Sequence, residues 1–86
     1  MRITKKYLNE LTYQVIGCAI EVHKHLGPGL LESIYEKCFL RELNLRGLAN
    51  KSQIWVPLEY KGLLLDTELR LDVLVEDLLC VELKAQ

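Results

Sequence analysis

Apolar residues recur at steps of three and four through the first part of the chain, which is the spacing of an amphipathic helix. This pattern predicts a helix over about residues 4–25. Its apolar stripe is formed by Leu8, Leu11, Val15, Cys18, Ala19, Val22 and Leu26. The sequence Gly-Pro-Gly at 27–29 ends this helix, because proline cannot continue the ladder of hydrogen bonds. A second helix is predicted over about residues 30–46, with Gly47 in the left-handed position that often follows a helix end.

From residue 53 onward the apolar pattern changes to a period of two, which is typical of strands with one buried face. The first predicted strand covers residues 53–60, and Pro57 indicates that it lies at a sheet edge or carries a bulge. A second strand is predicted over residues 63–75 and a third over residues 79–85. The predicted fold class is therefore α+β, with two N-terminal helices followed by a three-stranded antiparallel β meander.

The loop between the second and third predicted strands decides which side chains share a face. With a three-residue loop after Val75, that residue pairs with Leu79. The same register places Asp72 opposite Glu82, and Lys84 points to the same face because it follows Glu82 by two positions. A two-residue loop would mix polar with apolar side chains on both faces, which disfavours it. The sequence thus predicts two carboxylates and one ammonium group close together.

Composition excludes several classes of protein. A chain of 86 residues forms one small domain, and its net charge of −1 provides no basic field for non-specific binding of nucleic acid. Apolar runs are too short for a membrane-spanning helix, so we expect a soluble, cytoplasmic protein. The cysteines, Cys18, Cys38 and Cys80, are odd in number and widely spaced. We therefore expect buried free thiols, not a disulfide framework or a zinc cluster.

The cluster of Asp72, Glu82 and Lys84 has two interpretations. Carboxylate and carbonyl oxygens bind hard cations such as Mg²⁺, and a nearby lysine can orient a water or stabilise a phosphate. The alternative is a network of ion pairs on a solvated sheet face. Glu32 favours the first interpretation, because it falls inside the apolar arc of the second helix, between the directions of Phe39 and Leu43. A carboxylate buried there must be neutral, paired or bound to a cation.

Three motifs carry a resemblance to a known family. Gly29-Leu30-Leu31-Glu32-Ser33-Ile34-Tyr35 matches a Gly-x-x-Glu-x-x-Tyr signature, and Asp72 and then Val81-Glu82-Leu83-Lys84-Ala85 follow it. With these motifs the chain resembles the bacterial GxxExxY protein family, which is placed in the PD-(D/E)XK nuclease superfamily. The resemblance implies a restriction-endonuclease-like core. It also implies catalytic roles for Glu32, Asp72, Glu82 and Lys84, with Mg²⁺ or Mn²⁺ held by Asp72, Glu82 and the carbonyl oxygen of Leu83.

The family pattern continues beyond the point where this sequence stops. Residues 1–86 are therefore expected to form a single nuclease-like domain that lacks the C-terminal helix and strand of the family core. Two functions stay open at this point. One is a metal-dependent nuclease that hydrolyses phosphodiesters of DNA or RNA, and the other is a catalytically inert domain that acts as an oligomerisation or binding module. We expect nucleic acid as a partner, no membrane contact, and a homo-oligomer formed through an exposed sheet edge or face.

Overall fold

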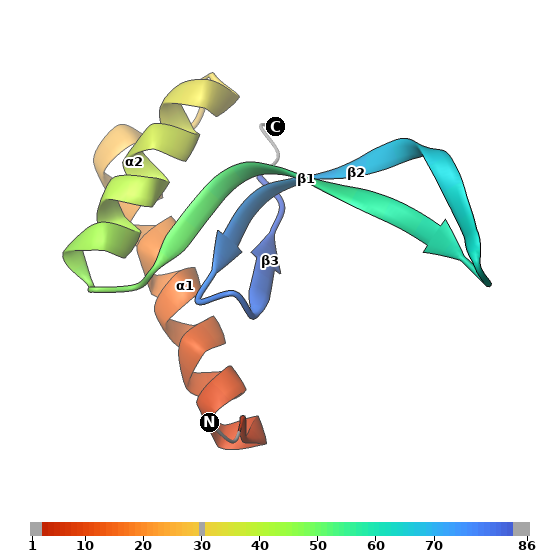
Figure 1. Ribbon diagram of the computed structural model, residues 1–86. Helices are drawn as coiled ribbons and strands as arrows, with labels where there is room; N and C mark the ends of the chain where they lie inside the picture. Colours follow the sequence, from red (N-terminus) through yellow and green to blue (C-terminus); the bar gives the residue numbers. More distant parts are fainter. Residues whose placement is uncertain (1–2, 30, 84–86) are drawn as a thin grey trace. The chain divides into compact units, whose positions relative to one another are not determined.

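The computed structural model describes residues 3–29 and 31–83, except for the side chains of residues 66–68. Two helices come first along the chain and an antiparallel sheet follows, so the predicted α+β class is confirmed for the described residues (Figure 1). The chain divides into two compact units. The helical unit runs up to Leu48, and the sheet unit comprises Ala49–Leu83.

The first helix, α1, comprises Lys5–Leu26, close to the predicted bounds. It begins after Thr4, whose hydroxyl oxygen accepts a hydrogen bond of 3.1 Å from the backbone N–H of Tyr7. This side chain satisfies one of the N–H groups that a helix start leaves without an intrahelical partner. The helix ends at Gly27, where φ is 73°, a left-handed value that glycine adopts without a steric penalty.

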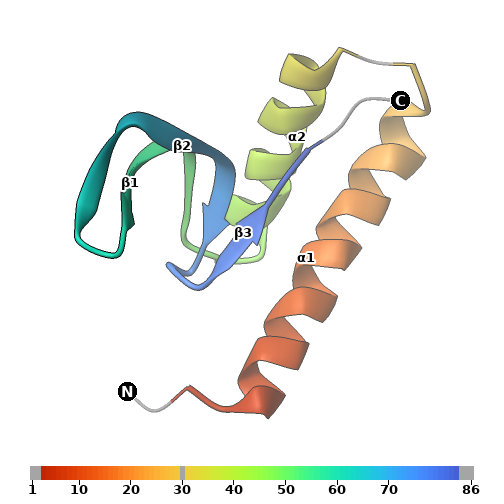
Figure 2. The ribbon, with the colours of Figure 1, turned by 90° about the vertical axis from the view of Figure 1, so that its right-hand side faces the viewer.

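The second helix, α2, comprises Glu32–Leu45 and packs against α1 (Figure 2). The buried side chains of the helical unit are Leu11, Val15, Cys18, Val22, Phe39 and Leu43. Two hydrogen bonds join the helices: the Tyr35 hydroxyl donates to the carbonyl oxygen of Ala19 at 3.0 Å, and Arg46 donates to Oε1 of Gln14 at 2.9 Å. Tyr35 lies in the first turn of α2 and Arg46 directly follows its last residue, so these two bonds hold both ends of α2 against α1.

In the sheet unit, β1 (Asn50–Tyr60), β2 (Leu63–Val75) and β3 (Leu79–Val81) form a three-stranded antiparallel sheet of the described residues. The strand order is β1-β2-β3, so β1 lies at an edge. The register of β1 against β2 shifts between Pro57 and Glu59. Both alternatives that Pro57 suggested, an edge position and an irregularity, are therefore confirmed.

Val75 pairs with Leu79, which confirms the predicted three-residue loop. The loop residues Glu76 and Asp77 both have φ near 54°, a left-handed conformation that is costly for residues other than glycine. Glu76 is held there by Ala49: its N–H donates to the Ala49 carbonyl at 2.8 Å, and its Oε1 accepts from the Ala49 N–H at 3.3 Å. These bonds offset the strain and keep the loop in register.

The predicted third strand, residues 79–85, is too long. In the structure β3 ends at Val81, and residues 84–86 lie outside the described part of the chain. The N–H of Leu83 donates at 3.0 Å to Oδ2 of Asp72, a side-chain acceptor. Because this N–H binds a carboxylate instead of a neighbouring backbone carbonyl, the ladder stops before Leu83.

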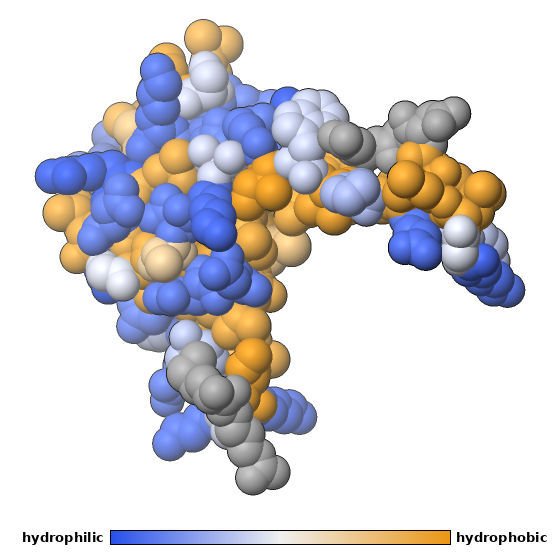
Figure 3. Space-filling view, viewed as in Figure 1, coloured by the Kyte–Doolittle hydropathy of each residue, from blue (hydrophilic) through white to orange (hydrophobic). Residues whose placement is uncertain are grey.

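The predicted apolar face of β2 is buried only near its C-terminal end. Val73 and Val75 are fully buried, whereas the leucines in the outer half of the strand, Leu63, Leu64, Leu65 and Leu69, are exposed. β3 pairs with β2 only over Val73–Val75, so the rest of β2 forms a two-stranded hairpin with β1. Figure 3 shows the apolar surface along this hairpin. The alternation of apolar and polar residues in β2 predicted one buried face along the whole strand. It could not show that β3 pairs only with Val73–Val75 and leaves the outer leucines uncovered.

The cysteines differ in exposure, contrary to the expectation that all three thiols are buried. Cys18 is buried, Cys38 is half-buried, and Cys80 is exposed on β3; none of the three is in a disulfide. Burial raises the pKa of the Cys18 thiol, although the positive charge of Arg46 opposes part of this shift. Cys80 alternates with the inward-facing Leu79 and Val81, so the period-two pattern of β3 places it outside.

Replacing Leu43 with alanine tests the core of the helical unit. Leu43 is fully buried, so Leu43→Ala should lower the free energy of unfolding by about 2–5 kcal/mol, through lost burial and the cavity left behind. Leu45→Ala is the matched control, because Leu45 lies in the same helix and its exposure is 62%. Urea unfolding would measure both. Equal losses for the two variants would contradict the packing described above.

Thiol labelling tests the order of cysteine exposure. In native protein at neutral pH, a maleimide should modify Cys80 first and Cys18 last, because Cys18 is buried and its raised pKa disfavours the reactive thiolate. Peptide mass mapping at timed intervals would measure the order. In urea the three rates should converge. Native Cys18 that reacts as fast as Cys80 would refute the assignment.

Candidate functional site

Asp72 is the best-positioned carboxylate of the predicted site. It lies in β2, its side chain is only 15% exposed, and both of its oxygens accept hydrogen bonds. Oδ2 accepts from the Leu83 N–H at 3.0 Å, and Oδ1 accepts from Nη2 of Arg70 at 3.4 Å. Arg70 is two residues earlier on the same strand, so it lies on the same face of the sheet. The carboxylate is therefore held on a regular strand by one backbone and one side-chain donor.

The structure supports the predicted register between Asp72 and Glu82. The last pair of the β2–β3 ladder is Val73 with Val81, and continuing it by one position places Asp72 opposite Glu82. Glu82 is exposed, as is Cys80, while Leu83 is buried. The alternation of inward and outward side chains thus continues past the end of β3, and the two carboxylates come from neighbouring positions of the hairpin.

The predicted roles of Lys84 and of the Leu83 carbonyl oxygen remain predictions. Lys84 lies outside the described residues, so its place beside the acids stays a prediction. The N–H of Leu83 is bound by Asp72, whereas the predicted role of its carbonyl oxygen in a metal shell is untested. The structure therefore joins Asp72 to the backbone of Leu83, the residue that follows Glu82.

The expectation that Glu32 is buried is wrong. Glu32 is exposed, and it is the first residue of α2, one residue after an exposed Leu31. The helical arc predicted the direction of its side chain but not its position along the axis, and the buried part of α2 begins only at Phe39. A carboxylate in the first helical turn is favoured by the helix dipole and needs no buried partner. Glu32 belongs to the helical unit, whereas Asp72 and Glu82 belong to the sheet unit.

The donor set of the hairpin suits a hard divalent cation. Asp72 and Glu82 supply carboxylate oxygens, each with lone pairs beyond those that the observed hydrogen bonds use. Mg²⁺ is commonly held by one or two carboxylates and keeps several waters, so two acids are enough. Within residues 3–29 and 31–83, no group of three or more His, Cys, Asp or Glu residues could hold a metal ion. This set therefore fits Mg²⁺ or Mn²⁺ better than a structural Zn²⁺, which needs four protein ligands.

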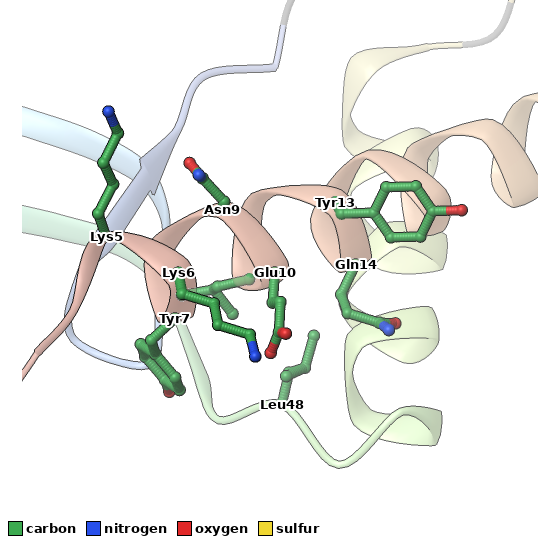
Figure 4. Close-up of a pocket in the computed structure, with 9 residues that line it drawn as sticks. Lys5, Lys6, Tyr7, Asn9, Glu10, Tyr13, Gln14 and Leu48 are labelled. Atoms are coloured by element: carbon green, nitrogen blue, oxygen red, sulfur yellow. The ribbon is translucent and has the colours of Figure 1, made fainter.

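The helical unit contains a pocket of about 640 Å³ that the sequence did not indicate. It is formed by the first turns of α1 and by Leu48 (Figure 4). Lysine, tyrosine, glutamate and amide side chains line it, and Lys6 and Glu10 project to the same side of the helix. Such residues are ordinary on a solvated helix end, so no sequence signal distinguishes them. None of Glu32, Asp72 and Glu82 lines this pocket.

Comparison with known protein families decides the ancestry of the chain. Residues 9–86 match the PD-(D/E)XK nuclease superfamily. The chain belongs to the PD-(D/E)XK nuclease superfamily. This match includes α1 from Asn9 onward, the whole of α2 and all three strands of the described sheet. No curated protein and no solved structure matches the chain. Nuclease-superfamily members typically depend on a metal ion, in agreement with the oxygen donors of the hairpin. Neither α1 nor α2 has the length and apolar character of a membrane-spanning helix.

Replacing Asp72 tests whether its bond to Leu83 holds the end of the hairpin. Asp72→Ala leaves the partly buried Leu83 N–H without this acceptor and should cost about 1–3 kcal/mol of stability. Asp72→Asn retains an oxygen acceptor and should cost less. Urea unfolding would compare them, with Asp77→Asn as the control, because the Asp77 side chain is 72% exposed and asparagine tolerates the left-handed backbone at this position. Equal effects of Asp72→Ala and Asp77→Asn would contradict this role.

Proposed function

We propose that this chain is a metal-dependent nuclease domain of the GxxExxY type, which hydrolyses phosphodiester bonds of DNA or RNA. One observation carries the proposal. Asp72 is held on β2 by its hydrogen bond from the Leu83 N–H, one position beyond the last β2–β3 pair of Val73 with Val81, in a chain that belongs to a nuclease superfamily. An arrangement of two oxygen ligands on adjacent strands suits a cation that must also contact a phosphate.

In the proposed reaction, water attacks the phosphorus and the bond from phosphorus to the leaving oxygen breaks. Bound Mg²⁺ or Mn²⁺ would neutralise the charge that develops on the phosphate oxygens. Asp72 and Glu82 would hold that ion, and the Leu83 carbonyl oxygen would add a third ligand. Arg70 would keep the Asp72 carboxylate oriented. Lys84 would donate a hydrogen bond to the attacking water or to a phosphate oxygen, and Glu32 would support the water network.

A catalytically inert binding or oligomerisation module is the second candidate. One observation favours it: Glu32, to which the family resemblance assigns a catalytic role, is exposed in the helical unit. The overall charge of −1 also provides no general attraction to nucleic acid. The two candidates differ in whether the domain cleaves a phosphodiester, so an experiment must separate metal binding from cleavage.

Metal binding and cleavage can be measured on the same variants. Mn²⁺ should raise the melting temperature of the wild type, because a cation that binds only the native state adds about 2.7 kcal/mol at one hundred times its Kd. Asp72→Asn should abolish this shift. The matched control is Asp77→Asn, which removes a carboxylate from the adjacent loop and should retain the shift. Differential scanning fluorimetry with and without Mn²⁺ would measure it.

Cleavage of single- and double-stranded DNA and of RNA would then be assayed with the same proteins. The nuclease proposal expects metal-dependent cleavage that Asp72→Asn and Lys84→Ala both remove and that Asp77→Asn retains. Metal binding without cleavage of any substrate would favour the inert module. Equal Mn²⁺ binding by wild type and Asp72→Asn, measured by calorimetry, would exclude Asp72 as a necessary ligand.

A further inference from the structure

The outer edge of β1 has the features of a strand that pairs with another chain. Among the described residues β1 is hydrogen-bonded to β2 alone. In an antiparallel pair, alternate residues direct their N–H and C=O away from the partner strand. The Glu76 N–H donates to the Ala49 carbonyl, so position 49 faces β2. Gln53 has a left-handed φ of 52°, but the pairs on both sides of it, Ser52 with Val73 and Ile54 with Leu71, keep the same register. Odd-numbered positions of β1 such as Lys51 and Trp55 therefore face β2. The even-numbered positions, including Ser52, Ile54, Val56 and Leu58, then face outward.

Proline is a common device for blocking sheet edges, but Pro57 does not block this one. Pro57 is an odd-numbered position paired with Glu68 of β2, so its missing N–H interrupts the bonds toward β2. The register shift next to Pro57 is consistent with that interruption. The outward row of N–H groups therefore continues past the proline, and the edge stays able to accept another strand.

The side chains of β1 form a charge pattern that is complementary to itself. Trp55 lies near the middle of the strand and is 60% exposed. Lys51 and Trp55 pair with Leu74 and Arg70, which are four positions apart on β2, so both lie on one face although φ of Gln53 between them is 52°. Glu59 lies four residues after Trp55, and the alternating burial of residues 55–59 places it on the same face. Lys51 and Glu59 are also exposed. Lys51 contacts Asp77 at 3.3 Å, but both side chains are mostly exposed, and an ion pair of this kind exchanges at little cost.

We propose that two copies of this chain pair through their β1 edges, antiparallel, about a two-fold axis at Trp55. This register places each Lys51 opposite Glu59 of the second copy and the two Trp55 side chains against each other. It also places Ile54 opposite Val56, so an apolar row is continued across the interface. Moving the axis by one residue brings Lys51 opposite either Pro57 or Lys61 and loses both ion pairs. Charge complementarity therefore selects the register centred on Trp55.

Pairing of two β1 strands would also stabilise the outer part of the sheet unit. The outer part of β1 and β2 is a two-stranded hairpin with exposed leucines, and two-stranded hairpins are marginally stable in water. Joining two β1 strands turns the pair of hairpins into a four-stranded sheet. A second copy is the partner that this edge fits, because an isologous interface requires a surface that is complementary to itself. The dimer does not depend on the proposed nuclease activity.

A charge-swap series tests the register. Wild-type protein should sediment as a dimer at micromolar concentration. Lys51→Glu and Glu59→Lys should each weaken dimerisation by about tenfold, because like charges then face each other twice across the interface. The double variant Lys51→Glu/Glu59→Lys should recover the wild-type dissociation constant. Circular dichroism would verify that each variant remains folded. Wild-type protein that is still monomeric at about 100 µM, which is roughly one hundred times a micromolar Kd, would refute the dimer.

Cross-linking gives an independent test of the axis. In a Cys80→Ser background, Trp55→Cys should form an intermolecular disulfide under mild oxidation, because residues on the axis face each other at a distance that a disulfide spans. Ser52→Cys is the control, since this register places it opposite Leu58 of the second copy. Equal cross-linking of both variants, or a charge-swap double variant that remains as weak as the single variants, would overturn the proposed register.

Discussion

The pairing of Val75 with Leu79 is the constraint on which the sheet unit depends. Because side chains alternate along a strand, a shift of one residue would turn every polar group of the hairpin to the other face. Glu76 and Asp77 adopt left-handed backbone conformations to make the turn, and Glu76 is tied to Ala49 through its N–H and its carboxylate. Ala49, directly before β1, therefore holds the loop between β2 and β3, so this loop fixes the register of β3 against β2 and of the first part of β1 against β2.

Asp72 shows how this constraint leads to chemistry. Its carboxylate accepts a hydrogen bond from the N–H of Leu83, two residues after the last residue of β3. A carboxylate with two hydrogen-bond donors is held in one orientation before any ligand arrives, and preorganisation of this kind is what a metal ligand requires. The same hydrogen bond thus serves both the stability of the hairpin and the proposed metal site.

The helical unit depends on a different interaction, the burial of Phe39 and Leu43 of α2 with the apolar stripe of α1. Both ends of α2 are then fixed by polar contacts of Tyr35 and Arg46. Glu32 lies before this packed segment and remains exposed. Its proposed role in a nuclease site therefore rests on its place in the Gly-x-x-Glu-x-x-Tyr motif, and not on any local need to neutralise a buried charge.

The sequence by itself determined the order of two helices and three strands and the turn after Val75, because these follow from local periodicity and from the residues that end each element. The strand bounds differ: β1 begins at Asn50, three residues before the predicted start. The same loop length and a period of two predict that Asp72 and Glu82 share a face, and the adjacent pair of Val73 with Val81 has the register that this prediction requires. Only the tertiary structure decided that Glu32 is exposed, that β3 ends at Val81 and that the outer leucines of β2 remain uncovered. Each of these depends on how far a neighbouring element extends, and periodicity gives the direction of a side chain but not the extent of its cover.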